Sequence, residues 1–474
     1  MHSIWTQHGQ IRPRNPLEQD LEADVAVIGA GMAGILIADA LQHAGRRVVV
    51  LEADRIGSGQ TRNTTAKITS QHGMCYRRLL DTLGPEMARQ YAQANQAAVQ
   101  AYRERVTEAG IDCDLEERDA YLFGTDADSL RAEAEAARSL GLPASTTVLP
   151  ASGLHAVKFA HQAQFHPLKF LQAVSEDLTI FEKTPVRQVD GSLVITDHGT
   201  IRSEQIVFAC HAPFVNFPGF YFARMHQQRS YVLALENVPQ VDGMFLGADE
   251  PSWSFRNAGD LLLLGGSGHR AGENREGGQY DALRQKAREW FPGSREVACW
   301  SAQDGVTLDH VPYIGPYAAG RPGWYVATGF QKWGMTTSMV SAMVLRDLLC
   351  GRDSPYGEVF RPGRFPLSAV PALASEVGHS AKGLLKRFFQ IPTETAAAIP
   401  PGHGGVVFLD GKKVGVYKEE NGTVYAVDIR CPHLGCQLEW DPEERSWDCP
   451  CHGSRFDYQG RLLSGPAQEG LRHG

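Results

Sequence analysis

The sequence has no excess of positive charge and no long hydrophobic run. Its 474 residues include 46 Lys and Arg against 54 Asp and Glu, a net charge of −8 at pH 7, so the basic footprint of a nucleic-acid-binding protein is absent. No apolar run approaches the roughly 18 residues of a membrane span. Residues 1–20 are polar and hold no hydrophobic signal segment. We therefore expect no nucleic-acid partner, no membrane span and a cytoplasmic location.

Cysteine is scarce outside one short region near the C-terminus. Nine cysteines occur in the chain, and five of them are far apart, which is typical of buried thiols and argues against a disulfide framework. The chain is nevertheless long enough for two or three domains with a sizeable core. The scattered cysteines are Cys75, Cys113, Cys210, Cys299 and Cys350.

The other four cysteines lie in two short loops that also carry histidine. Residues 431–436 read Cys-Pro-His-Leu-Gly-Cys, and residues 449–452 read Cys-Pro-Cys-His. An iron-sulfur cluster with two thiolates on one iron and two imidazoles on the other needs one Cys and one His from each of two loops, and this spacing provides both pairs. The spare thiols, Cys436 and Cys451, could form a bridge that ties the loops together. A zinc site is the alternative, although zinc sites usually space their ligands Cys-x2-Cys or His-x3-His.

The segment at about 402–467 resembles the Rieske family, including the disulfide-bearing type of cytochrome bc complexes. The resemblance implies that Cys436 pairs with Cys451 and that Ser454 hydrogen-bonds the cluster. Phe456 stands where high-potential relatives have Tyr, so one hydrogen bond is missing, and the potential should lie lower in the range of about −150 to +300 mV. The implied ligands of a [2Fe-2S] cluster are Cys431, His433, Cys449 and His452, and the implied covering loop is Gly465-Pro466-Ala467.

The N-terminal part carries a second cofactor motif. Residues 24–28 read as a buried strand, residues 35–44 as an amphipathic helix and residues 47–51 as the next strand. Before the helix stands Gly-Ala-Gly-Met-Ala-Gly, whose glycines allow a tight turn, close approach to a pyrophosphate and close packing of helix on strand. The N–H groups at the helix start would face phosphates, and Glu52 can accept hydrogen bonds from a ribose diol. The three glycines are Gly29, Gly31 and Gly34.

Glu52 suits either NAD or FAD, so the choice depends on later residues. Residues 57–67 form a small polar loop that could wrap phosphates or a flavin, or could be an ordinary surface loop. Residues 324–336 read as a strand, a glycine-bracketed turn and the start of a helix, whose N-terminus would favour an anionic reduced flavin; alternatively, the glycines only make a tight connection. Residues 24–356 resemble the D-amino-acid oxidase-like flavoprotein family, which implies FAD. The further residues expected at FAD are Thr64, Thr65, Lys67, Val186, Gly329, Gly334 and Met335.

The order of these patterns predicts the architecture. Charged helical stretches and short β-like runs separate the two flavin-binding segments, which suits a nucleotide domain interrupted by a substrate domain. We predict an α/β FAD-binding Rossmann-like domain with an inserted α+β substrate domain, followed by a small all-β Rieske domain. The expected divisions are an N-terminal extension at 1–20, the FAD-binding region at 21–360 with its insertion at about 145–270, a linker with an amphipathic helix at 361–400, and the Rieske domain at 401–474.

The two resemblances together imply a reaction. D-amino-acid oxidase-like enzymes oxidise a C–N bond of an amine or amino acid, and the gamma-glutamylputrescine and sarcosine oxidoreductase branches are nearest in pattern. A flavin takes two electrons as a hydride, and an iron-sulfur cluster takes one at a time. We expect an amine or amino-acid substrate, noncovalent FAD, and electron transfer through the cluster to an unknown acceptor. Such an enzyme is a dehydrogenase more than an oxidase.

The catalytic residues follow from proximity, because hydride transfer mainly needs positioning over the flavin. His72 matches a flavin-proximal position of the family, and Arg229 could bind a substrate carboxylate through two hydrogen bonds. The ordinary alternative for such residues is a structural role in the sheet. The candidate catalytic residues are His72, Tyr231, Lys332 and Trp333.

Two other functions stay open. The chain could be a reductase component that carries electrons from NADH through FAD and the cluster to an oxygenase, but such reductases generally need a second dinucleotide fold, and one Gly-x-Gly-x-x-Gly unit is present. The chain could also be a redox sensor without turnover, although complete cofactor motifs beside a substrate-sized middle domain argue against this function.

Overall fold

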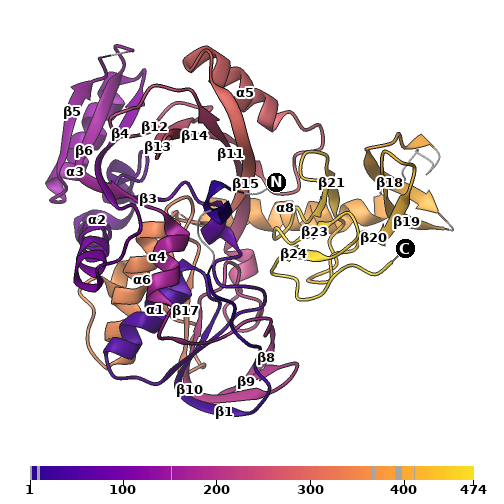
Figure 1. Ribbon diagram of the computed structural model, residues 1–474. Helices are drawn as coiled ribbons and strands as arrows, with labels where there is room; N and C mark the ends of the chain where they lie inside the picture. The colour runs from indigo at the N-terminus through magenta and orange to yellow at the C-terminus, as the bar shows by residue number, and fades with distance from the viewer. Residues whose placement is uncertain are drawn as a thin grey trace.

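The computed structural model describes residues 3–7, 11–150, 152–364, 369–389, 398–409 and 411–473. The expected linker at 361–400 and both chain ends therefore lie partly outside the described residues. Two large sheets with their helices are followed by two small sheets (Figure 1). Within the described ranges, no helix is long and apolar enough to cross a membrane.

The first sheet contains the nucleotide-binding pattern. Its strands are β1 (Leu21–Ile28), β2 (Val48–Leu51), β7 (Thr179–Phe181), β8 (Val186–Asp190), β9 (Leu193–Thr196), β10 (Thr200–Phe208), β16 (Tyr313–Pro316) and β17 (Trp324–Thr328). The main path runs β16-β17-β10-β1-β2-β7, with β8 and β9 attached at β10. Both neighbours of β1 run parallel to it, and β2 is buried along its whole length, as expected for parallel strands covered by helices.

Helices pack against both large sheets. They are α1 (Met32–His43), α2 (Tyr76–Ala109), α3 (Ala127–Ser139), α4 (Pro167–Val174), α5 (Gln279–Trp290), α6 (Gly334–Leu349) and α7 (Gly357–Phe360), with short 3-10 turns η1 (Ile4–Gln7), η2 (Gln60–Asn63) and η3 (Tyr221–Ala223). The helices α1 and α6 carry mostly apolar and small residues, and most of each helix is buried in the main core. A kink divides α2 at Gly84, directly before Pro85.

The second large sheet has nine strands. Its strands are β3 (Lys67–Ile68), β4 (Glu116–Gly124), β5 (Ala144–Val148), β6 (His155–Gln164), β11 (Met225–Glu236), β12 (Met244–Gly247), β13 (Ser254–Ala258), β14 (Leu261–Arg270) and β15 (Arg295–Thr307). The order is β15-β11-β14-β13-β12-β4-β6-β3, with β5 beside β6. Because side chains alternate along a strand, Gln227, Arg229 and Tyr231 of β11 share one face.

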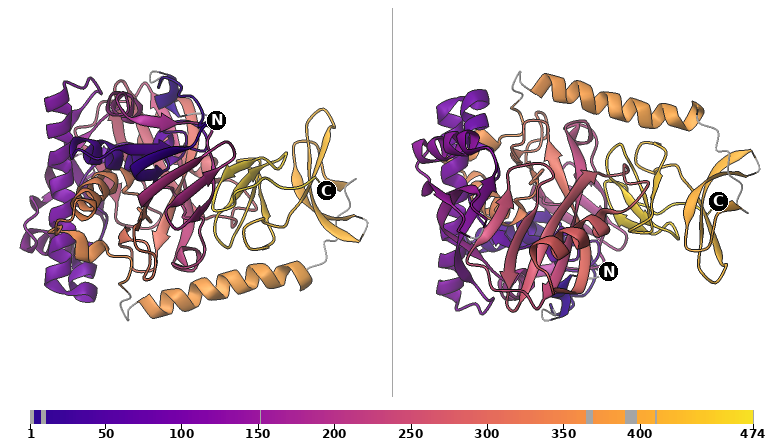
Figure 2. Two further views of the ribbon diagram at one scale, coloured as in Figure 1. Left: turned by 90° about the horizontal axis from the view of Figure 1, so that it is seen from below. Right: turned by 90° about the horizontal axis from the view of Figure 1, so that it is seen from above.

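The C-terminal part consists of two small antiparallel sheets. The strands are β18 (Gly404–Leu409), β19 (Lys412–Lys418), β20 (Val424–Asp428), β21 (Glu439–Asp441), β22 (Ser446–Asp448), β23 (Arg455–Asp457) and β24 (Leu462–Ser464). The sheet β21–β24 lies next to the second large sheet, and β18–β20 lies farther out (Figures 1 and 2). The predicted fold class is confirmed: an α/β flavin-type domain with an inserted sheet, then a small all-β domain.

A long helix, α8 (Val370–Phe389), runs along one side of the molecule from the flavin part toward the C-terminal sheets (Figure 2). Glu376 on α8 accepts two hydrogen bonds from Arg270, at 2.9 and 2.6 Å, and lies 3.0 Å from His226 Nδ1. A Cβ at Gly383 would lie 2.6 Å from the sulfur of Cys451. The helix therefore contacts both the second large sheet and the cysteine-bearing loops.

Candidate functional site

The glycine motif forms the turn between β1 and α1. Gly29 has φ +109, which residues with a side chain rarely adopt, and a Cβ at Gly34 would lie 1.8 Å from the Gly29 carbonyl oxygen. Glu52, directly after β2, accepts the N–H of Ala30 at 2.7 Å and the N–H of Asp54 at 2.8 Å. Burial raises the pKa of Glu52 although both N–H groups donate to it. The turn and the carboxylate together form a cradle that suits a dinucleotide.

The polar loop after β2 packs against the start of α1. Gly31 directly precedes α1, and Thr61 accepts the N–H of Met32 through Oγ1 at 2.9 Å. The N–H of Gly57 donates to the Ala30 carbonyl at 2.9 Å. The loop is therefore attached to the glycine motif and is not an independent surface excursion.

The end of this loop connects to the second large sheet. Thr64 Oγ1 accepts the N–H two residues farther along the chain at 2.9 Å. The Thr65 carbonyl accepts Nε of Arg256 at 2.6 Å, and Lys67 Nζ donates to the Phe245 carbonyl at 3.0 Å. Burial, followed by repulsion from Arg256, lowers the pKa of Lys67 to about 7.

The returning segment makes a tight turn between β17 and α6. Gly329 has φ +74, and a Cβ there would lie 2.4 Å from Cγ2 of Thr307. Gly334 is the first residue of α6, and Met335 is 5% exposed. Val186 begins β8 and is also buried. The structure thus places the glycines of both segments at strand–helix turns of the first sheet, where a helix N-terminus can approach a bound flavin.

His72 and Trp333 meet beside this turn. Their rings stack with centroids 4.6 Å apart and an interplanar angle of 15°. His72 Nε2 donates to the Thr69 carbonyl at 2.8 Å, so Nδ1 accepts from the hydroxyl of Tyr91 at 2.7 Å. Burial lowers the pKa of His72 to about 3, so the imidazole is neutral near pH 7.

Lys332 directly precedes Trp333. The charge of Lys332 lowers the pKa of Asp304 on β15. Burial of Asp304 has the larger and opposite effect, and it raises the pKa to about 7. Lys67 and Asp304 therefore both change charge close to neutral pH. Groups with such shifted pKa values are common where protons are transferred.

Tyr231 lies elsewhere. Its side chain is fully buried, and its hydroxyl bonds to His269 Nε2 at 2.9 Å and to Asn274 Nδ2 at 3.2 Å. Asn274 in turn donates to Asp441 of the C-terminal part at 3.3 Å. The structure therefore brings His72 and Trp333 together, with Lys332 adjacent in the chain, but it does not bring Tyr231 to them.

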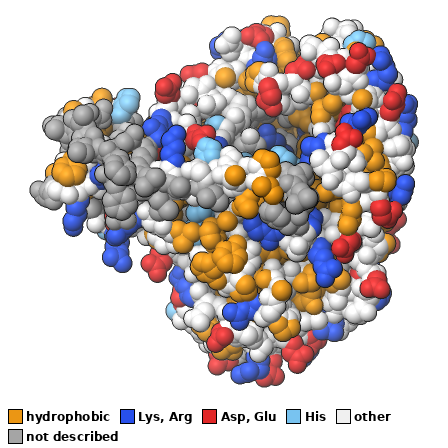
Figure 3. Space-filling model, turned by 180° about the vertical axis from the view of Figure 1, so that it is seen from behind, with side chains coloured by type: hydrophobic (Ala, Val, Ile, Leu, Met, Phe, Trp, Pro, Cys, Tyr) orange, Lys and Arg blue, Asp and Glu red, His pale blue; other side chains and the backbone are white. Residues whose placement is uncertain are grey.

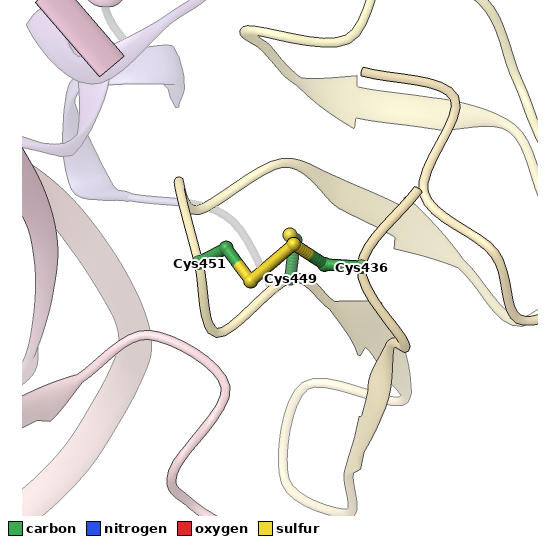
Figure 4. Close-up of side chains that lie close together, drawn as sticks. All are labelled: Cys436, Cys449 and Cys451. Carbon is green, nitrogen blue, oxygen red and sulfur yellow. A yellow bond between two sulfur atoms is a disulfide. The ribbon is translucent and has the colours of Figure 1, made fainter. Parts of the chain in front are cut away.

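The cysteine-bearing loops are closed and joined. In the first loop, the N–H of Gly435 donates to the Cys431 carbonyl at 2.9 Å. In the second loop, the N–H of Gly453 donates to the Cys449 carbonyl at 2.9 Å. A disulfide joins Cys436 to Cys451, as predicted. The sulfurs of Cys436, Cys449 and Cys451 lie within 4.8 Å of one another (Figure 4). Because two of these sulfurs are bonded to each other, only Cys449 of this group is free to bind a metal.

The remaining donors fit a Rieske cluster. Cys431 and Cys449 are 2% and 0% exposed and hydrogen-bond each other, and Ser454 hydrogen-bonds Cys431. His433 and His452 each have a buried Nδ1 that has no hydrogen-bond partner in the part of the chain that the structure describes. Such nitrogens are costly unless something binds them. Two thiols and two unpaired imidazole nitrogens are the donor set that this cluster requires.

Two further features agree with the Rieske pattern. Ser454 Oγ accepts the N–H of Ala467 at 3.0 Å, so the covering loop at 465–467 is fastened to the second cysteine loop. Phe456 on β23 is fully buried and pairs with Trp447 of β22.

The histidine edge of these loops faces the flavin part. His433 Nε2 donates to Asn216 Oδ1 at 2.8 Å, which leaves Nδ1 with a lone pair for iron. The ring of Phe222 stands nearly perpendicular to both histidine rings, 6.0 Å from His433 and 5.3 Å from His452. A small pocket at this contact is lined by Ala212, Pro213, Tyr221, Phe222, Met225, Gln227, His452 and Pro466.

A buried arginine holds the two parts together. Arg229 Nη1 donates to Asp441 at 3.0 Å and to Asp448 at 2.6 Å, and Nη2 donates to Gln303 at 2.8 Å. Gln303 donates to the Gly453 carbonyl at 2.8 Å. Burial and the neighbouring Asp448 raise the pKa of Asp441 to about 6. Burial would also raise the pKa of Asp448, but the charge of Arg229 holds that pKa below its usual value. The expectation that Arg229 meets a substrate carboxylate is wrong, because carboxylates of the same chain occupy its guanidinium.

Comparison with known proteins identifies both parts. Residues 24–348 match the family described as FAD dependent oxidoreductase, and residues 391–473 match the Rieske [2Fe-2S] domain. The chain therefore belongs to the FAD dependent oxidoreductase family, carries a C-terminal Rieske domain, and has FAD and a [2Fe-2S] cluster as its cofactors. It is 37% identical to the Rieske 2Fe-2S iron-sulfur protein YhfW of Bacillus subtilis strain 168, over 99% of this chain and 97% of that one.

Relatives of each half fit the same division. Part of the chain is 41% identical to cytochrome b6-f complex iron-sulfur subunit 2 of Trichormus variabilis, over 14% of this chain and 37% of that protein. A glycine oxidase from Geobacillus kaustophilus superposes with a TM-score of 0.62 at 21% identity, covering 73% of this chain and 99% of that chain. An L-proline dehydrogenase from P. horikoshii gives a TM-score of 0.63 at 16% identity, covering 73% and 98%. The last two likenesses show the fold.

Several residues of the contact between the two parts escaped sequence reasoning. Three residues of the flavin part lie near the histidine ligands: Asn216, Phe222 and Gln227. They are far from the ligands in sequence, since 217 residues separate Asn216 from His433. One local signal existed, because Asp448 directly precedes the ligand Cys449. A single sequence does not show which distant arginine such an aspartate meets.

Proposed function

We propose that this protein is a flavin-dependent dehydrogenase that oxidises the C–N bond of an amine or amino acid and sends the electrons through its own Rieske cluster to an acceptor outside the chain. When bound, FAD supplies two-electron chemistry as a hydride acceptor, and the cluster supplies one-electron transfer. The solved structures of similar fold include, by name, a glycine oxidase, an L-proline dehydrogenase and an L-amino acid deaminase from Proteus vulgaris. Noncovalent FAD and the cytoplasmic location stay predictions.

The orientation of the cluster loops carries this proposal. The two ligand histidines, His433 and His452, are turned toward the flavin part and contact it through Asn216 and Phe222. A fully buried arginine, Arg229, fixes the contact. The histidine edge of the cluster loops is therefore covered by the flavin part of the same chain, and this closeness favours electron transfer within one molecule.

Residues at the flavin turn support a positioning role. Neutral His72, held by Thr69 and Tyr91, stacks on Trp333 and keeps the indole in one orientation. Because its pKa is about 3, His72 cannot serve as a proton donor near pH 7. Asp304, with a pKa of about 7, is the better candidate for accepting a proton from a substrate ammonium group.

The test is an anaerobic titration of the holoenzyme with polyamines, N-methyl amino acids and amino acids, with NADH as comparator. Flavin absorbance and the electron paramagnetic resonance signal of the reduced cluster are followed together. We expect an amine or amino acid to bleach the flavin and then to produce the cluster signal, while NADH does neither. In a Cys431→Ser control, the flavin should still bleach without the cluster signal.

Two results would contradict the proposal. Rapid reduction of both cofactors by NADH alone would favour the reductase component. Reduction by none of the compounds, in a protein that dithionite reduces normally, would favour a redox sensor.

A further inference from the structure

We propose that the surface patch formed by Phe217, Phe220 and Leu434 is the docking site for an acidic one-electron carrier protein, which takes electrons from the cluster. This inference rests on the proposed function, because it names the acceptor that the outward electron flow requires. The three side chains are defined below as the exit patch.

The exit patch gathers exposed apolar side chains at one place. Phe217, Phe220 and Leu434 are 60%, 50% and 38% exposed, and the rings of Phe217 and Phe220 are 5.0 Å apart. Leu434 comes from the first cluster loop, which meets this segment where its neighbour His433 is hydrogen-bonded to Asn216, the residue before Phe217. Hydrophobic side chains also gather on the face of the molecule shown in Figure 3. Contiguous exposed apolar groups of this kind mark interaction sites.

One aromatic ring separates the exit patch from the iron ligands. Phe222 has its centroid 6.0 Å from Phe217 and 6.2 Å from Phe220. The same ring lies 6.0 Å from His433 and 5.3 Å from His452. Electron transfer slows steeply with distance, so a carrier seated on the exit patch is well placed to take an electron from the histidine side of the cluster.

Within the described part of the chain, most of the cluster ligands are almost fully covered, and the pocket beside His452 is small. The Nε2 of His433 already donates to Asn216, and Cys431 and Cys449 are 2% and 0% exposed. The backbone of α8 at Gly383 covers Cys451. A partner must therefore receive electrons across a protein surface, and interfaces of electron-transfer pairs are small, with less than about 1,200 Å² buried and an apolar centre within a polar rim.

Charge favours an acidic partner. The chain as a whole has a net charge of −8, yet residues 205–235, 429–438 and 449–456 around the exit patch and cluster contain no Asp or Glu. Arg430, next to the ligand Cys431, is 48% exposed although it also lies 3.3 Å from Asp428. Exposed Lys382 adjoins the part of α8 that covers the second loop. A negatively charged carrier would be steered to this region and repelled from the remaining surface.

The electron count fixes the stoichiometry. Oxidation of one amine to an imine breaks one C–H and one N–H bond and releases two electrons and two protons. Two carrier molecules are each reduced by one electron, because the cluster passes electrons singly. Both protons leave to water.

The experiment measures carrier reduction directly. Holoenzyme is reduced with dithionite under anaerobic conditions, freed of excess reductant and mixed in a stopped-flow instrument with an oxidised acidic blue-copper protein or a basic c-type cytochrome, each of higher potential than the cluster. Chemical reduction makes the outcome independent of whether an amine is the substrate, so the two proposals can fail separately.

We expect fast reduction of the acidic carrier, slowed by added salt, and slow reduction of the basic one. Phe220→Asn should lower the second-order rate constant about tenfold, as removal of an interface anchor does; Phe220 has φ +52, which Asn tolerates. Phe217→Ser should act in the same direction. The matched control is Phe408→Ser on β18, which removes a phenylalanine that is 49% exposed and should leave the rate unchanged.

The electron paramagnetic resonance spectrum of each reduced variant shows whether its cluster is intact. If Phe220→Asn lacks the cluster, the rate constant of Phe217→Ser tests the exit patch instead. Wild-type rates in the patch variants would overturn the inference, and so would a faster reaction with the basic cytochrome. Transfer to dioxygen or a soluble quinone, with neither protein reduced, would overturn it as well.

Discussion

Ser454 connects the cluster ligand Cys431 to the covering loop at 465–467. Its hydroxyl hydrogen-bonds Cys431 and accepts the N–H of Ala467. A hydrogen bond to a ligand sulfur stabilises the more negative, reduced cluster and so raises its potential. Phe456, which has no hydroxyl, removes one such bond from the usual set, which is why we expect a potential in the lower part of the Rieske range.

Loss of the Ser454 hydroxyl should lower the potential further. A hydrogen bond contributes about 1 kcal/mol, which is about 40 mV for a one-electron couple, so we expect Ser454→Ala to shift the midpoint down by about that amount. A redox titration followed by electron paramagnetic resonance measures it. Ser446→Ala is the control, because buried Ser446 donates to Asp448 at 2.9 Å and not to the cluster ligands. Equal midpoints in Ser454→Ala and wild type would contradict the assignment.

At the scale of elements, the two cofactor-binding regions could be predicted because their residues are close in sequence. The glycine turn before α1 and the paired loops around β22 each depend on fixed short spacings, and the structure closes both as expected. The faces of β11 could not be assigned in the same way. Alternation shows that Gln227, Arg229 and Tyr231 share a face, but a single strand does not reveal which face meets substrate. Arg229 therefore received the wrong partner.

The helix α8 shows a similar limit. The sequence predicts an amphipathic helix within residues 361–400, and the structure has a helix there at Val370–Phe389. Its attachment was not predictable, because Glu376 meets Arg270 across 106 residues of chain. Such a contact depends on how the whole molecule packs.

Attachment of α8 should depend on the Glu376 charge. Burial alone would raise the pKa of Glu376, but hydrogen bonds from His226 and Arg270 lower it to about 2. The folded pKa is below the unfolded value near 4.5, so this group stabilises the fold above pH 4.5, and the contribution is lost as pH falls toward 2. We expect Glu376→Gln to speed hydrogen exchange of α8 amides about tenfold at pH 7.

The pH dependence supplies the check on this element. The difference in unfolding free energy between wild type and Glu376→Gln should shrink from pH 4.5 downward. Glu358→Gln is the control, because its carboxylate is 57% exposed and 3.5 Å from Arg361, and it should change neither quantity. A difference that stays constant down to pH 2 would show that the charge of Glu376 is irrelevant.

For the whole molecule, Arg229 is a fully buried polar link between the two cofactor parts. Replacement by Met leaves buried Asp441 without its cation and leaves Asp448 with Arg455 alone, 3.4 Å away. Breaking a buried pair in this way costs about 3–5 kcal/mol. We expect Arg229→Met to separate the Rieske domain from the flavin part, seen as a larger radius of gyration in small-angle scattering and as two unfolding transitions in place of one. Substrate-driven reduction of the cluster should slow, while bleaching of the flavin stays fast.

Two further variants make this result interpretable. Arg284→Met removes an arginine that is 39% exposed and pairs with Asp281 and Glu296, so it should cost less than about 1 kcal/mol. Adding Asp441→Asn to Arg229→Met removes the charge that has lost its cation and should recover part of the loss. An unchanged scattering curve and a single transition in Arg229→Met would rule out this link.

The close approach of Gly383 to Cys451 limits the access of reducing thiols to the disulfide. A reducing thiol opens a disulfide by direct attack on one of its sulfurs, so access limits the rate. Here the backbone of α8 occupies the approach to Cys451, and Cys436 is 1% exposed. Glutathione can reach the disulfide after α8 has moved away from Cys451. The rate at which the bridge is reduced therefore depends on how often this helix opens as well as on the concentration of the attacking thiol.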